Sequence, residues 1–210
     1  MKQKRMTSPS STDSILLAAR KLFVQRGYGG VNLDAIAKKA SVARQTLYNN
    51  FGSKEALFRA MLDAHWAGFS GDDAFDGLDE IEKAGASAEE ILREVANRMV
   101  KFVEDADQIS FTRLVISESR RLPWIGKEFY DAGKGPLVNG LAEVLRGLTE
   151  RKLLDCPKPL LAAHQFFGLI LELMFWPYVM AIGPATSELP LPEEAVDEAI
   201  KMFMARYAKD

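Results

Sequence analysis

The stretch NLDAIAKKASVARQTLYNNFGSKEALF, from Asn32 to Phe58, predicts two short helices separated by a tight turn at residues 40–43. Apolar residues recur at helical spacing in both halves, so each helix can bury one face against a common core. The other face of the second helix is polar. Short helices joined in this way are typical of a helix-turn-helix, whose second helix reads base edges in the DNA major groove.

Three blocks of sequence, in order, resemble the DNA-binding domain of the tetracycline-repressor (TetR) family of one-component regulators. They are FVQRGY at residues 23–28, Ile36-Ala37, and TLYNNFGSKE at residues 46–55. The resemblance covers Ser10 to about Trp66. It implies an all-α fold, in which an N-terminal three-helix helix-turn-helix domain is followed by a helical ligand-binding and dimerisation domain. We expect these domains at residues 1–66 and 67–210.

Two residues of the turn depart from the family pattern. Ser41 stands where the family usually has Gly, and Ala43 stands where a Ser usually caps the second helix. A left-handed turn conformation is easier for Gly, and the loss of an N-cap side chain costs about 1 kcal/mol. We therefore expect a weaker start of the second helix within an unchanged fold.

The charge is divided unevenly along the chain. Residues 1–65 hold eleven Lys or Arg against four Asp or Glu, whereas the whole chain carries a net charge of −2. The basic segment, residues 1–65, is the one expected to contact DNA phosphates. A random distribution of charges explains this uneven division less well. The basic residues at positions 2–5 either add phosphate contacts or form a tail without a role. The single cysteine, Cys156, excludes an internal disulfide and fits a cytoplasmic protein.

Capping residues and apolar periodicity predict the other helices. Ser10 with Asp13 and Ser87 with Glu90 have capping-box spacing, and Asn32 and Ser53 are expected N-caps. Residues 70–85 favour a loop with one short helical turn. Further helices are expected at about 107–122, ending before a proline, and at about 126–154, broken near 133–136.

The segment from Pro159 to Ile182 is almost entirely apolar, but Glu172 interrupts it and it is short for a bilayer span. We therefore expect a helix sandwiched between protein surfaces, with no membrane partner. An amphipathic stripe from Val196 to Tyr207 forms the last helix. The family resemblance implies that the last two helices pack against their copies in a homodimer, as a four-helix bundle.

Candidate DNA contacts follow from position on the second helix of the pair. Early positions point at base edges, so Arg44 and Gln45 are the expected base contacts, and Arg can pair two-fold with guanine. The expected phosphate contacts are Asn32, Thr46, Tyr48, Asn49 and Lys54. The resemblance supports Tyr48 and Lys54 in this role, although Tyr48 could instead pack and Lys54 could be solvated. Asp34 stands where some family members carry a basic residue that reads a base.

The second domain is rich in aromatic residues, most of which must simply form the core. Its polar groups within apolar faces are more informative. Glu118 either pairs with a neighbour such as Arg121 or faces a cavity, and this region weakly resembles the AefR-like branch of the family. The expected effector contacts are Phe102, Phe111, Glu118, Trp124, Phe129, His164 and Phe166.

These features predict a ligand-responsive regulator that binds a palindromic double-stranded DNA operator as a dimer. The resemblance implies a repressor released by a small, mainly apolar effector. A constitutive dimeric DNA-binding protein without an inducer is the alternative, and a carrier or helical enzyme that lost DNA binding fits the basic face poorly. Catalysis would need a nucleophile and a base, and nothing places Cys156 near His164. No catalytic residue, metal or cofactor is expected.

Overall fold

The computed structural model describes residues 10–67, 74–104, 106–182 and 190–209. Helices make up the regular structure of these residues, and one isolated β-bridge joins Leu154 and Ala208. The chain divides into two compact units. Unit 1 comprises residues 1–67 and 114–128, and unit 2 comprises residues 68–113 and 129–210. The all-α prediction is confirmed, and residues 114–128, which the sequence placed in the second domain, pack with the N-terminal segment.

Unit 1 contains α1 (Ser11–Arg26), α2 (Leu33–Lys39), α3 (Arg44–Phe51) and α4 (Lys54–Trp66), followed by the end of α8 (Ala106–Ser119) and by α9 (Pro123–Phe129). The predicted N-caps are confirmed: Ser10 forms a capping box with Asp13, Asn32 accepts a hydrogen bond from the N–H of Ala35, and Ser53 accepts one from Ala56. Each side chain satisfies a backbone donor that a helix start otherwise leaves free. These caps define where the short helices begin.

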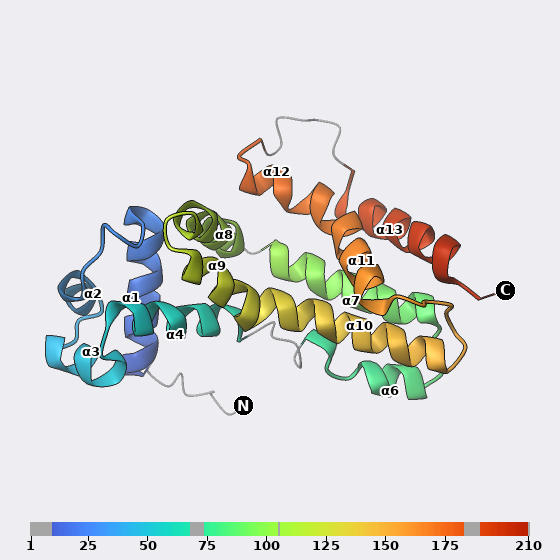
Figure 1. Cartoon of the computed structure of the whole chain (residues 1–210), viewed down its shortest axis with the longest axis horizontal. Helices are drawn as coiled ribbons and strands as arrows, with labels where there is room; N and C mark the ends of the chain where they lie inside the picture. The colour runs from blue at the N-terminus through green and yellow to red at the C-terminus, as the bar shows by residue number, and fades with distance from the viewer. Residues whose placement is uncertain (1–9, 68–73, 105, 183–189, 210) are drawn as a thin grey trace, which may run out of the picture. The chain divides into compact units, whose positions relative to one another are not determined.

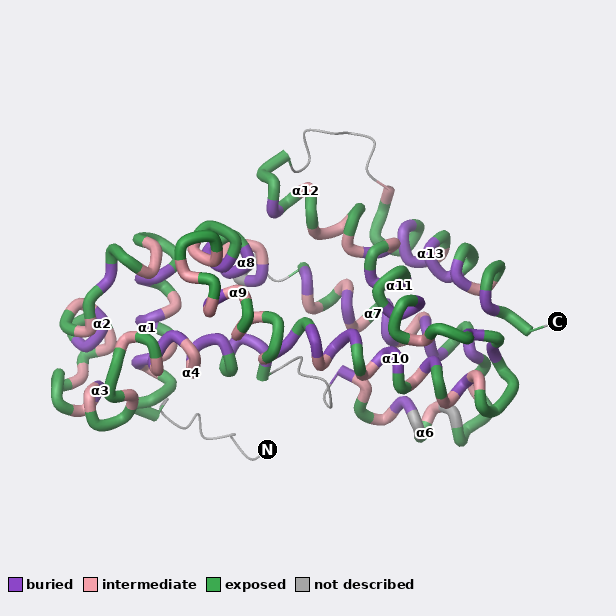
Figure 2. Tube along the Cα trace, in the orientation of Figure 1, coloured by how far each residue is buried: buried purple, intermediate pink, exposed green. Residues whose placement is uncertain are grey.

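The core of unit 1 takes at least one large apolar side chain from each of α1, α2, α3 and α4. Phe23, Ile36, Leu47 and Phe58 are completely buried, and buried stretches alternate with exposed ones along the helices of this unit (Figure 2). Such alternation is what an amphipathic helix produces when one stripe faces the core. The core therefore fixes which face of α3 is left for contacts with other molecules.

The turn between α2 and α3 has both expected departures. Ser41 adopts a φ of 57°, the left-handed conformation that suits Gly better, and Ala43 makes no side-chain cap bond at the start of α3. Backbone hydrogen bonds still close the turn, with the N–H of Val42 donating to the carbonyl of Ala37 at 3.0 Å. The helix-turn-helix geometry is thus kept without the favoured side chains.

Unit 2 contains α6 (Leu78–Lys83), α7 (Ala88–Val103), the start of α8 (Ala106–Ser119) and η1 (Tyr130–Lys134). It continues with α10 (Gly135–Glu150), α11 (Pro159–Met174), α12 (Trp176–Val179) and α13 (Pro192–Tyr207). Helices α7, α10, α11 and α13 pack together around its core (Figure 1). None of the helices in the described ranges combines the length and apolar composition needed to cross a bilayer.

Several predicted boundaries shift. Helix α8 ends at Ser119, and α9 begins at Pro123 rather than at residue 126, because proline is well suited to the first turn of a helix. The expected break near 133–136 is a π-helical turn, in which the Tyr130 ring packs so closely that a Cβ on Gly135 would lie 2.9 Å from its Cε1. The apolar run is interrupted at Phe175, two residues before a proline.

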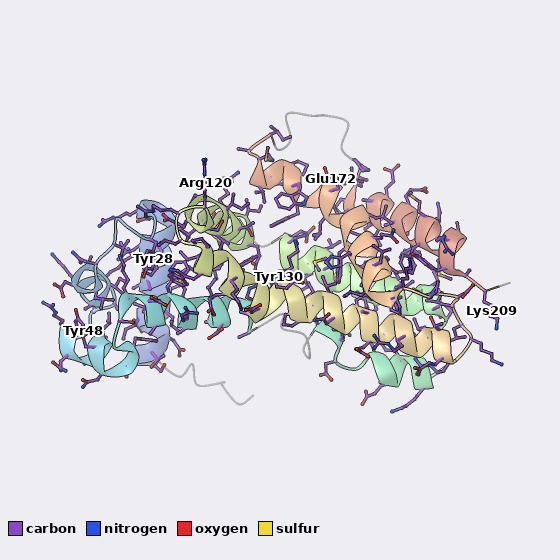
Figure 3. All side chains as sticks on the ribbon, viewed as in Figure 1. Tyr28, Tyr48, Arg120, Tyr130, Glu172 and Lys209 are labelled. Carbon is purple, nitrogen blue, oxygen red and sulfur yellow. The ribbon has the colours of Figure 1, made fainter. Side chains whose placement is uncertain are left out.

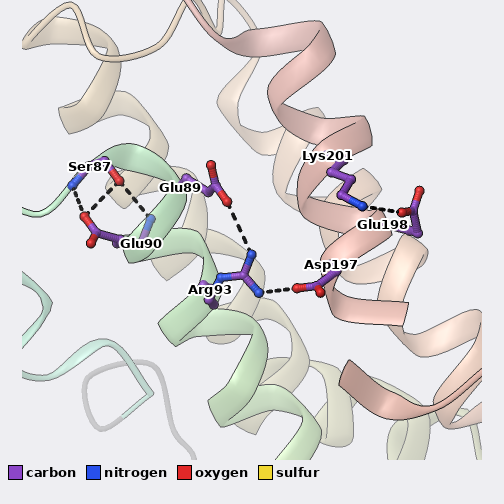
Figure 4. A network of polar contacts seen from close by, with 7 residues as sticks. All are labelled: Ser87, Glu89, Glu90, Arg93, Asp197, Glu198 and Lys201. Carbon is purple, nitrogen blue, oxygen red and sulfur yellow. Dashed lines mark hydrogen bonds and ion pairs between the residues drawn. The ribbon is translucent and has the colours of Figure 1, made fainter. Parts of the chain in front are cut away.

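Polar contacts tie α7 to α13 in unit 2 (Figure 4). The predicted capping box of Ser87 and Glu90 is present at the start of α7. One turn later Arg93 pairs with Glu89 on its own helix and with Asp197 on α13. Hydrogen bonding by the capping serine lowers the pKa of Glu90. These contacts fix the start of α7 and its pairing with α13, one of the two helices that the sequence assigned to the dimer contact.

Candidate nucleic-acid interface

The outer face of α3 presents polar side chains, while its inner face holds the helix on the core. Leu47 is completely buried, whereas Arg44, Gln45 and Asn49 are exposed and Tyr48 is half-buried. Tyr48 lies on this helix in Figure 3. These side chains supply donors and acceptors on one short helix, as major-groove readout requires.

The candidate base-reading residues contact their neighbours in the free protein. Arg44 Nε lies 2.9 Å from an Asp34 carboxylate oxygen, and Arg44 Nη2 donates to the Tyr48 hydroxyl at 3.4 Å. The Tyr48 hydrogen bond, followed by the charge of Asp34, raises the pKa of Arg44. Gln45 Nε2 donates to Asn49 Oδ1 at 2.8 Å. Four of the five α3 residues proposed from the sequence therefore form two pairs, and the partners in each pair lie one helical turn apart.

Two of the proposed phosphate contacts already take part in local structure. Asn32 uses its side-chain oxygen to cap α2, which leaves its amide N–H groups for a phosphate. Thr46 is half-buried in the first turn of α3, and its backbone N–H donates to the carbonyl of Ala43. The cap formed by Asn32 was expected from the sequence, whereas the position of Thr46 in the α3 turn was not.

Lys54 serves an internal role that the sequence did not reveal. Its ammonium group donates to the backbone carbonyls of Tyr28 at 2.9 Å and Val31 at 3.0 Å, and it lies 4.4 Å from the centre of the Tyr28 ring. Burial lowers the pKa of Lys54, and the charge of Arg121 adds to this effect. Two of its three N–H donors thus hold the turn between α1 and α2. One donor remains for a phosphate.

Residues 114–128 contact the same turn. The Tyr28 ring packs against Phe23, Phe58 and Trp124, with ring centroids 5.3 to 5.7 Å apart. Tyr28 lies among the helices of unit 1 in Figure 3. Desolvation raises the pKa of the Tyr28 hydroxyl. Trp124, proposed from the sequence as an effector contact, completes an aromatic cluster beside the helix-turn-helix.

Glu118 also lies at this turn. Its carboxylate accepts a hydrogen bond from the N–H of Tyr28 and pairs with Arg121 at 3.1 Å. Pairing with Arg121 was one of the two alternatives considered from the sequence. Arg59 on α4 adds a second link, since it forms an ion pair with Glu128 and stacks over the Trp124 ring. No local pattern could have indicated the contacts of Glu118 with Tyr28 and of Arg59 with Glu128 and Trp124, because they join residues far apart in the chain.

The aromatic residues among the remaining expected effector contacts are buried or partly buried in unit 2. Phe166 is completely buried in the core of unit 2, where its ring lies 5.2 Å from that of Phe203. Phe111 is also completely buried and lies 6.4 Å from Phe129. Phe102 is partly buried against the core. These aromatic residues have the packing role that is the default for their kind.

A cavity of about 250 Å³ opens elsewhere in unit 2, near the ends of α7 and α11. Arg113 stabilises this region by donating from Nε to the carbonyl of Val179 at 2.9 Å and from Nη2 to that of Tyr178. None of the seven residues proposed from the sequence lines the cavity. Its walls are formed by Val103, Glu104, Ile109, Leu173, Met174, Tyr178, Pro190 and Pro192.

Helices α11 and α13 share an outward surface. Leu161 is 50% exposed and Met202 is 59% exposed, and a Cβ on Gly168 would meet nothing within 4 Å. His164 lies exposed on α11. A shallow groove between the two helices is lined by Gln165, Gly168, Leu169, Glu172, Leu173, Met202, Phe203, Arg206 and Tyr207. An exposed apolar surface of this kind is typical of a protein interface.

Two observations on the described residues bear on a metal site and on a catalytic cysteine. It contains no group of three or more His, Cys, Asp and Glu residues that could hold a metal ion. Cys156 is buried, and desolvation raises the pKa of its thiol, which disfavours the reactive thiolate.

Known proteins resemble this chain in both of its parts. Residues 15–61 match the model of the bacterial regulatory proteins of the tetR family, and residues 90–209 match the C-terminal domain of AefR-like transcriptional repressors. The transcriptional activator FasR of Mycolicibacterium smegmatis is 29% identical over 104 residues, which cover 50% of this chain and 45% of FasR. The chain spans less than half the length of the curated relatives it matches first.

Solved structures agree over nearly the whole chain. A TetR-family regulator structure from Mesorhizobium loti has a TM-score of 0.76 and 26% identity, covering 95% of this chain and 97% of that one. The flavonoid-responsive regulator FrrA has a TM-score of 0.73 and 28% identity, with 94% and 97% covered. Together with the match of the AefR-like domain over more than half of the sequence, these likenesses show that the chain belongs to the TetR family of transcriptional regulators, a family of DNA-binding proteins rather than enzymes.

Proposed function

We propose that this protein is a dimeric, ligand-responsive transcriptional repressor that binds a palindromic operator and is released from it by a small, mainly apolar effector. The observation that carries this proposal is the outer face of α3, where Arg44, Gln45, Tyr48 and Asn49 stand on a helix anchored by a buried Leu47. The surplus of basic residues in the first 65 positions supports contact with phosphates. A regulator of this kind acts in the cytoplasm, where the chromosome lies.

In this proposal Arg44 and Gln45 read base edges, and Asn32, Thr46, Tyr48 and Asn49 contact phosphates. Lys54 contributes its one remaining donor to a phosphate and otherwise holds the α1 to α2 turn. Base contacts specify the sequence, whereas phosphate contacts set the register and orientation of the protein.

We assign the dimer contact to the surface shared by α11 and α13, because its exposed apolar side chains and open Gly168 suit the close approach of a second copy. A two-fold pair of α3 helices would bind half-sites separated by about one DNA turn, roughly 34 Å, or a multiple of it. The operator should therefore be a palindrome.

We assign the effector to the cavity near the ends of α7 and α11, whose lining is mainly apolar. Helix α8 contributes Ile109 to the cavity wall and Glu118 to the contact with Tyr28. An effector that shifts α8 would thus change the support of the helix-turn-helix, and binding to DNA would weaken by the difference in effector affinity between the two states. The flavonoid response of FrrA supports an aromatic effector.

Repression is supported by the match to the AefR-like repressor domain, whereas FasR is an activator. The alternative of a constitutive DNA-binding protein without an inducer is favoured by the complete burial of Phe111 and Phe166, which leaves these residues unavailable to a ligand. Release of the protein from DNA on addition of an effector would distinguish an inducible repressor from a constitutive DNA-binding protein.

The direct test measures binding of the purified protein to duplex fragments taken from beside its own coding region, by gel shift at moderate salt. We expect the wild type to bind one fragment specifically. Arg44→Ala should abolish this specific binding and leave only the weaker binding that is common to all sequences. Tyr48→Phe should weaken binding to every duplex. A panel of flavonoids and fatty acids is then added to the complex. Release by one class supports an inducible repressor, no release supports the constitutive alternative, and undiminished operator binding by Arg44→Ala would reject the assignment of this residue.

A further inference from the structure

Asp34 and Arg44 form an ion pair across the turn of the helix-turn-helix. Asp34 is the second residue of α2, and Arg44 is the first residue of α3. The Arg44 Nε atom lies 2.9 Å from the Asp34 carboxylate, and both side chains are more than half exposed. An exposed pair of this kind contributes little to the stability of a folded protein. Its location on the base-reading side chain points to a role in recognition.

The pair leaves one edge of the guanidinium group open. Asp34 accepts from the Nε–H, and the Tyr48 hydroxyl lies within hydrogen-bond distance of Nη2. The Tyr48 ring also lies under the guanidinium, 5.3 Å from its central carbon. A guanidinium has five N–H donors in a rigid plane. The donors at the tip of the side chain, on Nη1 and Nη2, remain for the O6 and N7 atoms of a guanine.

Holding Arg44 in this way would reduce the freedom that the side chain loses on binding. It would also impose a direction, since the guanidinium can meet a base only with its tip. The negative charge of Asp34 is repelled by the DNA phosphates, which weakens binding to any sequence. Only the contact between Arg44 and a guanine offsets this repulsion, so complexes without that guanine are disfavoured.

We propose that Asp34 is a positioning residue for DNA specificity, which orients Arg44 through its Nε atom so that the tip of the guanidinium pairs with a guanine of the operator. This inference rests on the proposed function, because it requires α3 to enter the major groove. It gives Asp34 a defined role at a position where some family members carry a basic residue that reads a base.

The test uses the full-length protein and an operator obtained by selection from a randomised duplex library with the wild type. Dissociation constants are measured by fluorescence anisotropy at one salt concentration for three duplexes. These are the selected operator, the same operator with the guanine of the half-site changed to adenine, and a scrambled sequence. The readout is the ratio between the first two constants, which a merely structural role of Asp34 would not change.

We expect Asp34→Ala to reduce the preference for the guanine operator roughly fivefold to tenfold, as partial loss of a bidentate contact implies, while binding to the scrambled duplex stays equal or becomes tighter. Asp34→Asn should lose less, because its amide oxygen can still accept from Nε. In an Arg44→Ala background, Asp34→Ala should leave the ratio unchanged. Asp63→Ala, which removes an exposed carboxylate from α4, is the control for the change in net charge.

Two results would overturn the inference while the proposed function stands. If Asp34→Ala tightens binding to all three duplexes by the same factor, the residue acts only as a repelling charge. If the loss of preference persists without Arg44, the residue does not act through it. A wild-type protein that selects no sequence from the library would instead remove the proposed function, and this inference with it.

Discussion

Glu118 accepts a hydrogen bond from the backbone N–H of Tyr28 at 3.0 Å, although the two residues are 90 positions apart. The carboxylate lies directly over Gly27, where a Cβ would come within 2.5 Å of Glu118 Oε1. Gly27 ends α1 with a φ of 70°. Gly27 at the end of α1 therefore leaves room for the carboxylate of Glu118. Only 12% of the Glu118 side chain is exposed.

Glu118→Ala should lower the free energy of unfolding of unit 1 by about 1 to 3 kcal/mol, because it leaves a part-buried N–H without its acceptor. Glu118→Gln should lose less, since an amide oxygen can still accept. Urea denaturation measures both variants, and Arg120→Ala on the exposed side of the same segment is the matched control. Equal stability of Glu118→Ala and wild type would show that the contact contributes nothing.

Gly27→Ala should destabilise the wild type more than it destabilises Glu118→Ala. The added methyl group meets the carboxylate only when Glu118 is present, whereas the strain of the positive φ remains in both backgrounds. A double-mutant cycle from the same urea curves measures the difference. Additive effects would mean that the two residues do not interact.

Stability should fall as the solution is acidified, because His65 is buried. Burial, with the charge of Arg20 adding to it, lowers the pKa of His65 from 6.5 to about 3. Between these values the unfolded chain binds a proton that the folded protein does not. The contribution of His65 to the free energy of unfolding is therefore constant above pH 6.5. As the pH falls from 6.5 toward 3, this free energy decreases by up to about 1.4 kcal/mol per pH unit.

Unfolding curves at several pH values test this prediction, and His65→Gln should flatten the profile between pH 6.5 and 4. His164→Gln is the control, because this second histidine is exposed on α11. A wild-type profile that is already flat in this window would contradict the burial argument.

Ala43→Ser should stabilise unit 1 by about 1 kcal/mol. Ala43 already has the extended backbone of an N-cap, with φ −65° and ψ 142°, but it supplies no cap bond to α3. Thermal melts followed by circular dichroism measure the gain. Ala60→Ser, inside α4, should give none, since the interior of a helix has no free N–H to satisfy. Equal shifts for both variants would point to a cause other than capping.

Met202→Glu should break the proposed dimer, because it places a charge on an exposed apolar surface of α13. Light scattering after size-exclusion chromatography gives the mass of the particle, and the variant should also lose operator affinity by giving up the second half-site. Leu17→Glu changes a similarly exposed side chain of α1, 54% exposed, and should leave the dimer intact. A monomeric wild type would refute the assignment.

The caps and the turn were predictable from the sequence because their interactions are local. Ser10, Asn32, Ser53 and Ser87 each bond a backbone N–H three residues away, so residue type and spacing suffice. The strained turn at Ser41 was visible for the same reason. The polar face of α3 was also predictable, because helical periodicity places residues three or four positions apart on the same face. Once the apolar positions are assigned to the core, the remaining positions must face outward.

By itself, the sequence determined the helical fold, the family and the face of α3 that is free to meet DNA, because these depend on patterns within a few turns of chain. The tertiary structure decided that Lys54, Glu118 and Trp124 all contact the turn at Tyr28. Their partners are distant in sequence, and a charged or aromatic side chain carries no local mark of the group it will meet. Only the packing of residues 114–128 against the first four helices brings those groups together.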